Sequence, residues 1–373
     1  MIYKKIGKNS DLISSIGFGT GFHLPENESG INMEDVIKSS LDKGVNFIDT
    51  APVYGNGLSE TILGSVLQKI GRDKVFLASK VSPEDTTYLG VLKSAEDSLK
   101  RLKTDRIDLF QVHWPNPNVP ISETMAAMEK LVKDGKIRHI GVSNFSLSET
   151  IATSQILKSN NLASLQAEYN FFERAAENEV LPYCDKNNII FIAYSPLAQG
   201  NLINGKKQYE FVKQISKKYN CSPGQIVLKW LTMNSSVVVI PNTSKTSRAL
   251  ENAGASEICI TNEDYHLISK NLKTEIEMVD LKEIRVSNDY NRKVYLTIRE
   301  AMDNKMNMTP SPIELAEEMK KGSFLKPIRL KQIEEPGGVK KFDLVEGRLR
   351  YWSWAIAHGW DKKIPSLVWK SKE

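Results

Sequence analysis

The chain has 373 residues, of which 40% are hydrophobic and 25% charged, with a formal net charge of +5. This length exceeds the roughly 250 residues of a typical parallel eight-stranded barrel, so we expect more than one domain. The chain has no apolar stretch long enough to cross a bilayer and no secretory signal, and its three cysteines (Cys184, Cys221 and Cys259) match neither disulfide nor metal spacing, so we expect a cytoplasmic protein.

Eight short apolar runs of strand type alternate with longer amphipathic stretches from residue 14 onward. The runs are SIGFGT, VNFIDTA, VFLASKV, IDLFQVHW, IRHIGVSNF, SLQAEYNFF, IIFIAYSPL and VVVIPNT. The intervening helix patterns include residues 33–44, which end at Gly44, and residues 121–136, for which Ser122 is the expected N-cap. This alternation predicts an α/β fold, a (β/α)8 TIM barrel of parallel strands. An N-terminal hairpin with its turn at residues 7–10 is expected to cover the barrel floor.

Four residues that follow these apolar runs, Asp49, Tyr54, Lys80 and His113, are the candidate catalytic residues. The C-terminal ends of parallel barrel strands meet at one rim, so we expect the four side chains to meet there. A phenol with a pKa of about 10 is a poor acid near neutrality, but a neighbouring ammonium is expected to lower this pKa. Such a tyrosine can protonate a carbonyl oxygen while hydride reaches the carbon. The alternative is an ordinary buried ion pair of Asp49 and Lys80 beside two half-buried rim residues.

Seven sequence blocks in the first 275 residues or so resemble, in order, the aldo-keto reductase family. They are GFGT (17–20), DTAPVYG (49–55), VHWP (112–115), GVSNFS (141–146), LQAEYN (165–170), AYSPLAQGNL (193–202) and VIPNTSKTSRALEN (239–252). The resemblance implies an oxidoreductase that reduces a small aldehyde, ketone or sugar carbonyl with a nicotinamide dinucleotide. It also implies that Asp49, Tyr54, Lys80 and His113 form the catalytic tetrad.

The family resemblance further implies that the dinucleotide lies extended across the barrel mouth, and no GxGxxG motif occurs in the chain. It assigns Tyr194 to stack on the nicotinamide, and the backbone of residues 195–202 to wrap the pyrophosphate. The alternative for Tyr194 is a core aromatic side chain. The implied cofactor contacts are Thr20, Asp49, Ser143, Asn144, Gln166, Tyr194, Ser195, Leu197, Gln199, Thr243, Ser244, Lys245, Arg248 and Asn252.

Residues 240–252 bear on the choice between NADPH and NADH. A helix expected to begin near Thr246 presents free amides to a phosphate, and Lys245 and Arg248 add positive charge. Arg248 falls where the family places the arginine for the 2′-phosphate, whereas Asn242 stands where the family often has a basic residue. We expect NADPH, because a guanidinium suits phosphate geometry, and NADH is the alternative.

The composition changes in the last quarter of the chain. Residues 283–373 carry 18 of the 50 Lys and Arg residues, 13 of the 45 Asp and Glu residues, and four of the six tryptophans. The predicted elements there are a helix with a capping box at Ser311–Glu314 that closes at Gly322, a strand at 325–333, a turn at 336–338, a strand at 339–346, a helix at 347–358 and a last strand. We therefore expect a barrel at 1–275, a linker at 276–283 and a small α+β domain at 284–373.

The segment FDLVEGRLRYWSWAIAHGWDKKIPSLV in this last domain resembles the ParB/sulfiredoxin-like nucleotide-binding fold. The resemblance implies a site for ATP or another nucleotide at Gly347, Arg348 and Arg350, where a glycine and a helix start meet two guanidiniums. The alternative is a solvated basic face. Arg348 replaces the catalytic cysteine of sulfiredoxins, which excludes sulfinic acid repair, and the modest net charge argues against DNA binding.

Two functions from different classes remain open. The first is an NADPH-dependent carbonyl reductase fused to a nucleotide-binding module, and the second is a redox-sensing regulatory protein with slow or incidental reductase activity. The intact tetrad favours the first. Residues expected to line the substrate site are Phe22, His23, Trp114, Asn116 and Phe172, and their mixture of aromatic and polar groups fits a small polar carbonyl compound.

Overall fold

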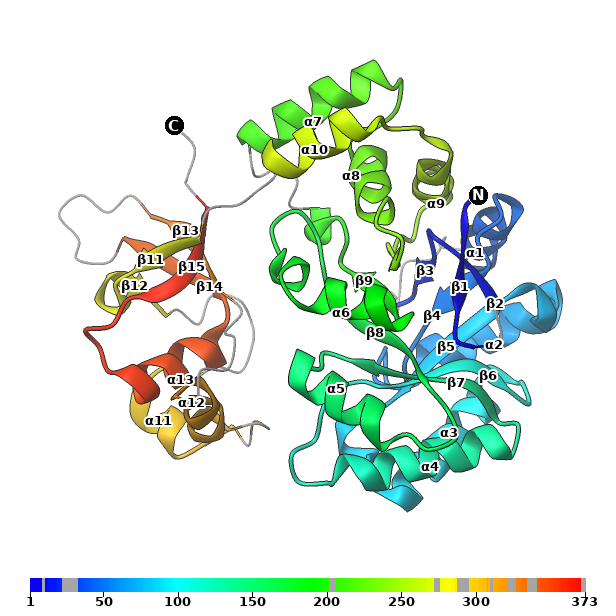
Figure 1. Ribbon diagram of the computed structural model, residues 1–373, viewed down its shortest axis with the longest axis horizontal. Helices are drawn as coiled ribbons and strands as arrows, with labels where there is room; N and C mark the ends of the chain where they lie inside the picture. The colour runs from blue at the N-terminus through cyan, green and yellow to red at the C-terminus, as the bar shows by residue number, and fades with distance from the viewer. Residues whose placement is uncertain are drawn as a thin grey trace. The chain divides into compact units, whose positions relative to one another are not determined.

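The computed structural model describes residues 1–8, 11–21, 33–200, 206–271, 276–286, 295–306, 308, 311–320, 327–333 and 341–369. They belong to two compact units, Met1–Lys273 and Thr274–Glu373, each built around its own hydrophobic core (Figure 1). Phe22, His23, Gly322 and the turn expected at 336–338 lie outside the described residues. No helix of the described ranges combines the length and the apolar character needed to span a membrane.

Eight parallel strands form the sheet of the first unit, and neighbours in the sheet are consecutive in the sequence. They are β3 (Phe18–Gly19), β4 (Phe47–Asp49), β5 (Phe76–Val81), β6 (Ile107–Val112), β7 (Ile137–Ser143), β8 (Leu162–Glu168), β9 (Ile190–Tyr194) and β10 (Val237–Val239). The ends of the sheet meet, because Ile16 forms a parallel bridge with Val239 and the Gly17 amide donates to the Val239 carbonyl at 2.8 Å. The predicted α/β barrel of eight parallel strands is therefore confirmed.

Helices of the first unit follow its strands in alternation (Figure 1). They are α1 (Met33–Asp42), α2 (Leu58–Ile70), α3 (Tyr88–Leu102), α4 (Ile121–Lys133), α5 (Leu147–Ile156), α6 (Val180–Asn187), α7 (Lys206–Lys218), α8 (Pro223–Thr232), α9 (Thr246–Gly254) and α10 (Asn262–Asn271). The expected N-cap of α4 is wrong: Pro120 occupies the N-cap position and Ser122 lies inside the first turn. Pro120 has no side chain that can cap the helix, and its carbonyl accepts from the Glu123 amide at 2.9 Å.

An antiparallel hairpin of β1 (Tyr3–Ile6) and β2 (Asp11–Ser14) precedes the barrel. Lys4 Nζ donates to the backbone carbonyl of Val237, where β10 starts, at 2.6 Å. Asp11 accepts hydrogen bonds from Arg138 and His139, near the start of β7, each at 2.6 Å. The hairpin thus lies against the N-terminal ends of the strands, which confirms the expected cover of the barrel floor.

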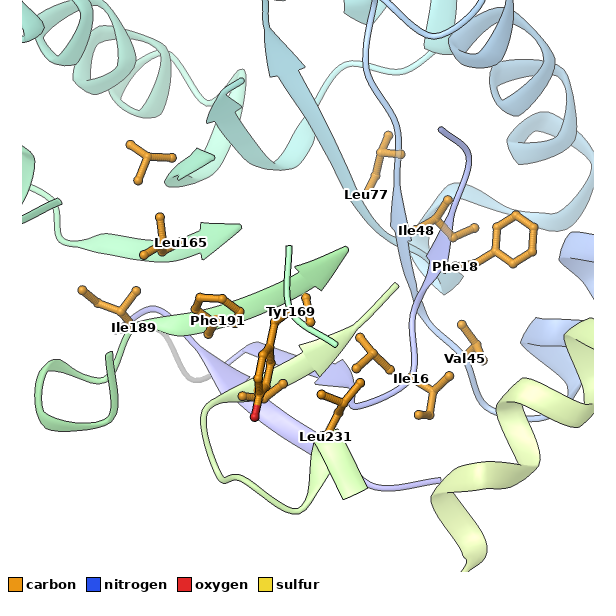
Figure 2. Packing of buried hydrophobic residues seen from close by; sticks show 14 of the residues in the cluster. Ile16, Phe18, Val45, Ile48, Leu77, Leu165, Tyr169, Ile189, Phe191 and Leu231 are labelled. Carbon is orange, nitrogen blue, oxygen red and sulfur yellow. The ribbon is translucent and has the colours of Figure 1, made fainter. Parts of the chain in front are cut away.

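Side chains along each strand alternate between two buried layers. The inner layer is apolar near the floor and includes Ile6, Ile13, Phe47, Phe76, Ala78, Leu109, Ile192 and Val238. The outer layer packs between the strands and the helices, and Figure 2 shows part of it, including Ile48, Leu77 and Phe191. This core fills the lumen from the floor upward, so the C-terminal strand ends are left for polar residues.

In its described residues, the second unit has a mixed five-stranded sheet and three α-helices. In spatial order its strands are β11 (Ile276–Val279), β15 (Ile364–Trp369), β13 (Ile328–Gln332), β14 (Phe342–Glu346) and β12 (Ile284–Arg285). Its helices are α11 (Ile298–Met302), α12 (Pro312–Lys320) and α13 (Arg348–His358), and they lie together in Figure 1. The helices predicted from Ser311 and at 347–358 and the strands predicted at 325–333 and 339–346 correspond to α12, α13, β13 and β14 over the residues that are described, and the predicted last strand is β15, whereas β11, β12 and α11 were not predicted.

The linker expected at residues 276–283 is wrong. Ile276–Val279 is an edge strand antiparallel to β15, with Val279 opposite Ile364. Val279, Leu281 and Ile284 are buried in the core of the second unit, since apolar side chains recur among the charged ones that suggested a linker. By contrast, the capping box of α12 is present: Ser311 N donates to Glu314 Oε2 at 2.7 Å, and Glu314 N donates to Ser311 Oγ at 3.2 Å.

Candidate active site

Along the strands of the barrel, the inward-facing residues are apolar at first and become polar near the C-terminal end of the strand. On β5 the inward series runs from Phe76 through Ala78 to Lys80, and on β4 it runs from Phe47 to Asp49. Residues two apart on a strand share a face, so the same alternation that packs the lumen aims Lys80 and Asp49 at each other. The site is thus a direct extension of the barrel core.

Lys80 is the centre of the catalytic cluster. Its Nζ donates to Asp49 Oδ1 at 2.5 Å, to the Thr50 carbonyl oxygen at 3.0 Å and to the Tyr54 hydroxyl at 3.2 Å. Both charged side chains are fully buried, with 0% of Lys80 and 1% of Asp49 exposed. Burial by itself lowers the pKa of Lys80, but Asp49 and Tyr54 outweigh burial and raise this pKa above its usual value. Lys80 therefore stays an ammonium.

The expected lowering of the Tyr54 pKa is wrong. Burial raises the pKa of Tyr54 more than the Lys80 ammonium lowers it, and the Asp49 carboxylate raises it further. The expectation left out the burial of the Tyr54 hydroxyl, which is the largest effect, and the Asp49 carboxylate paired with Lys80 also offsets part of its positive charge. Tyr54 is consequently a protonated phenol at neutral pH, already hydrogen-bonded to the cation that would stabilise its phenolate.

His113 lies beside Tyr54 with its ring buried. The two rings meet edge to face at 5.8 Å between centroids, and Trp114 stacks on the His113 imidazole at 3.7 Å. Burial, followed by the Lys80 charge, lowers the pKa of His113 to about 2, so the imidazole is neutral. Its buried Nδ1 has no hydrogen-bond partner among the described residues. A neutral imidazole in this position can donate its N–H to an uncharged oxygen of a ligand.

Gln111 is a site residue that sequence reasoning missed. It lies on β6 between Leu109 and His113 on the inward face, and its Nε2 donates to Asp49 Oδ2 at 3.1 Å. Gln166 Nε2 donates to the same oxygen at 2.9 Å. The available signal was a glutamine inside an otherwise apolar strand, since a buried amide needs hydrogen-bond partners.

Four predicted cofactor residues form one hydrogen-bonded group at the ends of β7, β8 and β9. Asn144, at φ 61°, donates from Nδ2 to the His113 carbonyl at 3.0 Å and to Ser143 Oγ at 3.1 Å, and its Oδ1 accepts from the Tyr194 hydroxyl at 2.9 Å. These bonds leave the Ser143 hydroxyl hydrogen and a second lone pair on Asn144 Oδ1. A carboxamide offers one acceptor oxygen and two donor hydrogens, so this donor and acceptor set, with Gln166 Oε1, fits the nicotinamide carboxamide.

The segment after β9 has an unusual backbone. Ser195, Ala198 and Gln199 all have positive φ, at 48°, 49° and 55°. Each such L-residue costs about 1–2 kcal/mol in the left-handed region, so surrounding bonds must hold the segment. Asn170 Nδ2 donates to the Ser195 carbonyl at 3.1 Å, and the Ala198 amide donates to the same oxygen at 2.9 Å. Leu197 packs against the core beneath, so the segment is shaped before any ligand binds.

The residues expected around the adenosine phosphate follow the last strand, β10. Lys245 is the N-cap of α9 and provides no side-chain cap, and its amide donates to Thr243 Oγ1 at 3.0 Å. Arg248 lies in the first turn with 65% of its side chain exposed and pairs with Glu251 at 3.1 Å. Ser244 is exposed and Asn252 is partly buried later in α9. The helix start therefore combines free amides with two exposed cations.

The remaining predicted residues differ in their surroundings. Thr20 donates from Oγ1 to the Asp49 carbonyl at 3.0 Å, so it supports the end of β4. Trp114 is 43% exposed beside His113. Asn116 donates to the Pro83 carbonyl at 2.8 Å, which ties together the loops after β5 and β6. Phe172 is buried in the core against Phe171.

In the second unit, Gly347 is the N-cap of α13 with φ 98°, and Arg348 and Arg350 lie in the first turn. A Cβ on Gly347 would lie 2.8 Å from Ile328 Cγ2 and 3.2 Å from Arg350 Nη2. Arg350 Nη1 donates to the Pro327 carbonyl at 2.8 Å. The three residues named for a phosphate site are therefore neighbours, and one of the two arginines also joins α13 to the start of β13.

Comparisons with known proteins concern the barrel. The model of the aldo/keto reductase family matches residues 15–273. A methylglyoxal reductase of Escherichia coli is 33% identical over 274 residues, which cover 72% of this chain and 95% of that protein. A glyoxal reductase of Bacillus subtilis is 35% identical over 260 residues, which cover 69% and 89%. An aldo/keto reductase structure from Klebsiella pneumoniae, in complex with NADP and acetate, has a TM-score of 0.66 at 29% identity, covering 73% of this chain and 97% of that one.

Proposed function

This chain belongs to the aldo/keto reductase family, and on that premise we propose that it reduces the carbonyl group of a small aldehyde, ketone or sugar with NADPH. The observation that carries the proposal is the buried Lys80 ammonium, which bonds Asp49 and the Tyr54 hydroxyl at once. A phenol placed against a fixed cation is arranged to lose its proton to a substrate. When bound, NADPH supplies the hydride for the carbonyl carbon.

Tyr54 donates the proton in this reaction. Its pKa lies above the usual value, so the phenol is protonated at neutral pH and can deliver its hydrogen to the oxygen of the reduced carbonyl. The phenolate that remains already accepts a hydrogen bond from Lys80 at 3.2 Å, so no reorganisation is needed to stabilise the new negative charge. Asp49 keeps Lys80 charged and oriented.

His113 positions the carbonyl group. Its neutral imidazole can donate one N–H to the carbonyl oxygen, and stacking on Trp114 fixes the ring plane. Burial, and then the Lys80 charge, lower the pKa of His113, so the ring does not compete with Tyr54 as an acid. Tyr54 and His113 thus both act on the carbonyl oxygen of the substrate: Tyr54 donates the proton, and His113 orients the group.

The cofactor assignment follows from two groups of residues and one related structure. Ser143, Asn144 and Gln166 match the donors and acceptors of a carboxamide. For the phosphate of NADPH, the uncapped start of α9 and the exposed Arg248 provide amides and charge. A related structure from Klebsiella pneumoniae contains NADPH, which supports the preference over NADH.

The substrate class is a small carbonyl compound. Relatives that are about a third identical are a methylglyoxal reductase and a glyoxal reductase, which supports a short 1,2-dicarbonyl compound here. The test is NADPH oxidation by the purified chain with methylglyoxal, glyoxal and a series of aldoses, each compared with NADH. Saturable oxidation of NADPH with at least one of them supports the proposal, and no turnover above a buffer blank with any of them contradicts it.

We further propose that the second unit binds the phosphates of a nucleotide such as ATP at Gly347, Arg348 and Arg350. The resemblance of this segment to the ParB/sulfiredoxin-like fold and the positive φ of Gly347 at the start of α13 support the proposal. Calorimetry of the full chain with ATP tests it, with Arg348→Ala and the Tyr54→Phe barrel variant in parallel. Binding lost only in Arg348→Ala fits the site, whereas equal binding in all three contradicts it.

A further inference from the structure

Gln111 is the only amide on the inward face of β6, a strand whose residues are all buried. Leu109 precedes it on that face and His113 follows it. A buried amide without partners costs about 1–3 kcal/mol, so an apolar residue would serve the core better unless the amide has a task. Its hydrogen bonds identify that task.

The Gln111 amide bonds on both sides. Nε2 donates to Asp49 Oδ2 at 3.1 Å, and Oε1 accepts from Ser164 Oγ and from Gln166 Nε2, each at 3.4 Å. Gly141, on the strand between β6 and β8, makes room for these contacts. A Cβ there would lie 2.3 Å from Ser164 Oγ and 2.8 Å from Gln111 Cγ.

We propose that Gln111 is a positioning residue for the reductase reaction, which holds the Asp49 carboxylate so that Lys80 stays directed at Tyr54; this inference rests on the proposed function of the barrel. Asp49 is 1% exposed, and its two carboxylate oxygens have different hydrogen-bond donors. Oδ1 accepts from Lys80, and Oδ2 accepts from Gln111 and Gln166.

The two donors to Asp49 Oδ2, the amides of Gln111 and Gln166, are uncharged. They replace the water that burial removes from the carboxylate, yet they add no positive charge that would compete with Lys80. Two amides also fix the plane of the carboxylate, because each approaches Oδ2 from a different strand, β6 or β8. Without Gln111 the carboxylate can rotate, and Lys80 follows it away from the Tyr54 oxygen.

Two variants test this role in the full-length protein. Gln111→Met keeps the volume and removes the donor, and we expect kcat for aldehyde reduction to fall about 10-fold or more, as for one hydrogen bond to a charged group. KM for the aldehyde and the Kd of NADPH should change by no more than about threefold, since Gln111 meets the proposed cofactor site only through Gln166 Nε2 and not through the Oε1 atom assigned to the carboxamide.

Gln111→Glu keeps the shape but makes the donor depend on pH. Burial and the nearby Asp49 charge raise the pKa of the introduced carboxyl. Below that pKa its O–H donates to Asp49 Oδ2, and above it a second carboxylate repels Asp49. We therefore expect an activity that is present at acidic pH and lost as pH rises, a limb absent from the wild type and from Gln111→Met. Because this variant is isosteric, it also serves if Gln111→Met does not fold.

Asn46→Ala is the matched control for stability. Asn46 joins the N-terminal hairpin to the start of β4, where its Oδ1 accepts from Ser14 N at 2.7 Å and its Nδ2 donates to the Leu12 carbonyl at 2.9 Å. This variant should lower Tm and leave kcat unchanged. If the Gln111 variants likewise lower Tm but keep the wild-type kcat and pH profile, Gln111 is only structural and the proposal is overturned.

A second arm does not depend on activity. Melting temperatures of Gln111→Met, Asp49→Ala and the double variant form a cycle, and the two losses should be less than additive because each variant alone removes the Gln111–Asp49 hydrogen bond. Additive losses overturn the proposal. If instead the wild type reduces no carbonyl compound while the losses are non-additive, the proposed function fails and the Gln111–Asp49 coupling stands.

Discussion

Gln166 donates from Nε2 to Asp49 Oδ2 at 2.9 Å, and this bond joins the proposed nicotinamide site to the catalytic ion pair. The same amide carries Oε1 on its other side, which is the atom suited to a carboxamide N–H. Cofactor binding and the orientation of Asp49 therefore act on one side chain. A residue that contacts only the cofactor or only Asp49 should affect either NADPH binding or kcat, but not both.

Gln166→Met should weaken NADPH binding and lower kcat together, each by about 10-fold, because it removes one hydrogen bond toward each group. Ser143→Ala is the matched comparison, since Ser143 bonds Asn144 and not Asp49. We expect it to weaken NADPH binding and leave kcat at saturating NADPH within about twofold. Fluorescence titration of NADPH and steady-state kinetics measure both quantities, and identical profiles for the two variants would refute the division of roles.

Tyr54→Phe should lower kcat by about 100-fold or more, the range of a general acid. The Kd of NADPH should hardly change, because the ring remains and only the hydroxyl that bonds Lys80 is lost. Stopped-flow reduction at saturating NADPH measures the step directly. More than about a tenth of wild-type turnover, a barrier change below about 1.4 kcal/mol, would show that another group delivers the proton.

His113 should make the protein less stable in acid. Its folded pKa is about 2 and its ordinary value is 6.5, so the unfolded chain takes up a proton as the pH falls below about 6.5 while the folded chain does not. Stability from the neutral ring is thus present above that pH and lost below it, by about 2 kcal/mol between about pH 7 and about pH 5.

Denaturant unfolding at those two pH values checks this contribution. His113→Phe keeps an aromatic ring against Trp114, but it cannot titrate, so its free energy of unfolding should fall less with acid than that of the wild type. Equal losses in both proteins would mean that other groups account for the acid sensitivity.

Arg248→Ala should weaken NADPH by about 1.5–3 kcal/mol, the usual effect of a charge-assisted hydrogen bond, and leave NADH nearly unaffected. The Arg248 side chain is 65% exposed and, among the residues that the structure describes, pairs with Glu251 on its own helix, so its removal should cost little stability. Titration with both cofactors gives the comparison. A similar loss for NADH would place Arg248 on the pyrophosphate or in a structural role.

Gly347→Ala should destabilise the second unit more than Gly359→Ala does. Both glycines flank α13 with positive φ, at 98° and 77°, so both substitutions carry backbone strain of about 1–2 kcal/mol. A Cβ on Gly347 would also press on Ile328 Cγ2 at 2.8 Å, whereas a Cβ on Gly359 meets no atom within 4 Å. Differential scanning calorimetry of the full chain measures the difference in melting temperature. Equal decreases for the two variants would show that the Ile328 side chain moves aside without loss of stability.

The architecture of the barrel was predictable from local pattern. Eight apolar runs alternating with helical stretches leave few topologies, and parallel strands place their C-terminal ends at one edge. Asp49, Lys80 and His113 each follow such a run, which is why their meeting could be expected from spacing alone. The same reasoning failed at residues 276–283, because the charged residues there conceal the buried series of Val279, Leu281 and Ile284.

The tertiary structure decided the protonation state of Tyr54 and the hydrogen-bond partners of Gln111. The sequence put a lysine near a tyrosine, but the sign of the Tyr54 pKa shift depends on how far burial and Asp49 offset that lysine, and both are three-dimensional quantities. Gln111 reads as one polar residue in a strand until β4 and β8 bring Asp49, Gln166 and itself together. Sequence alone determined which residues face the lumen, because strand alternation is local. Only the closed barrel decided which lumen residues touch, because that depends on the stagger between strands distant in the chain.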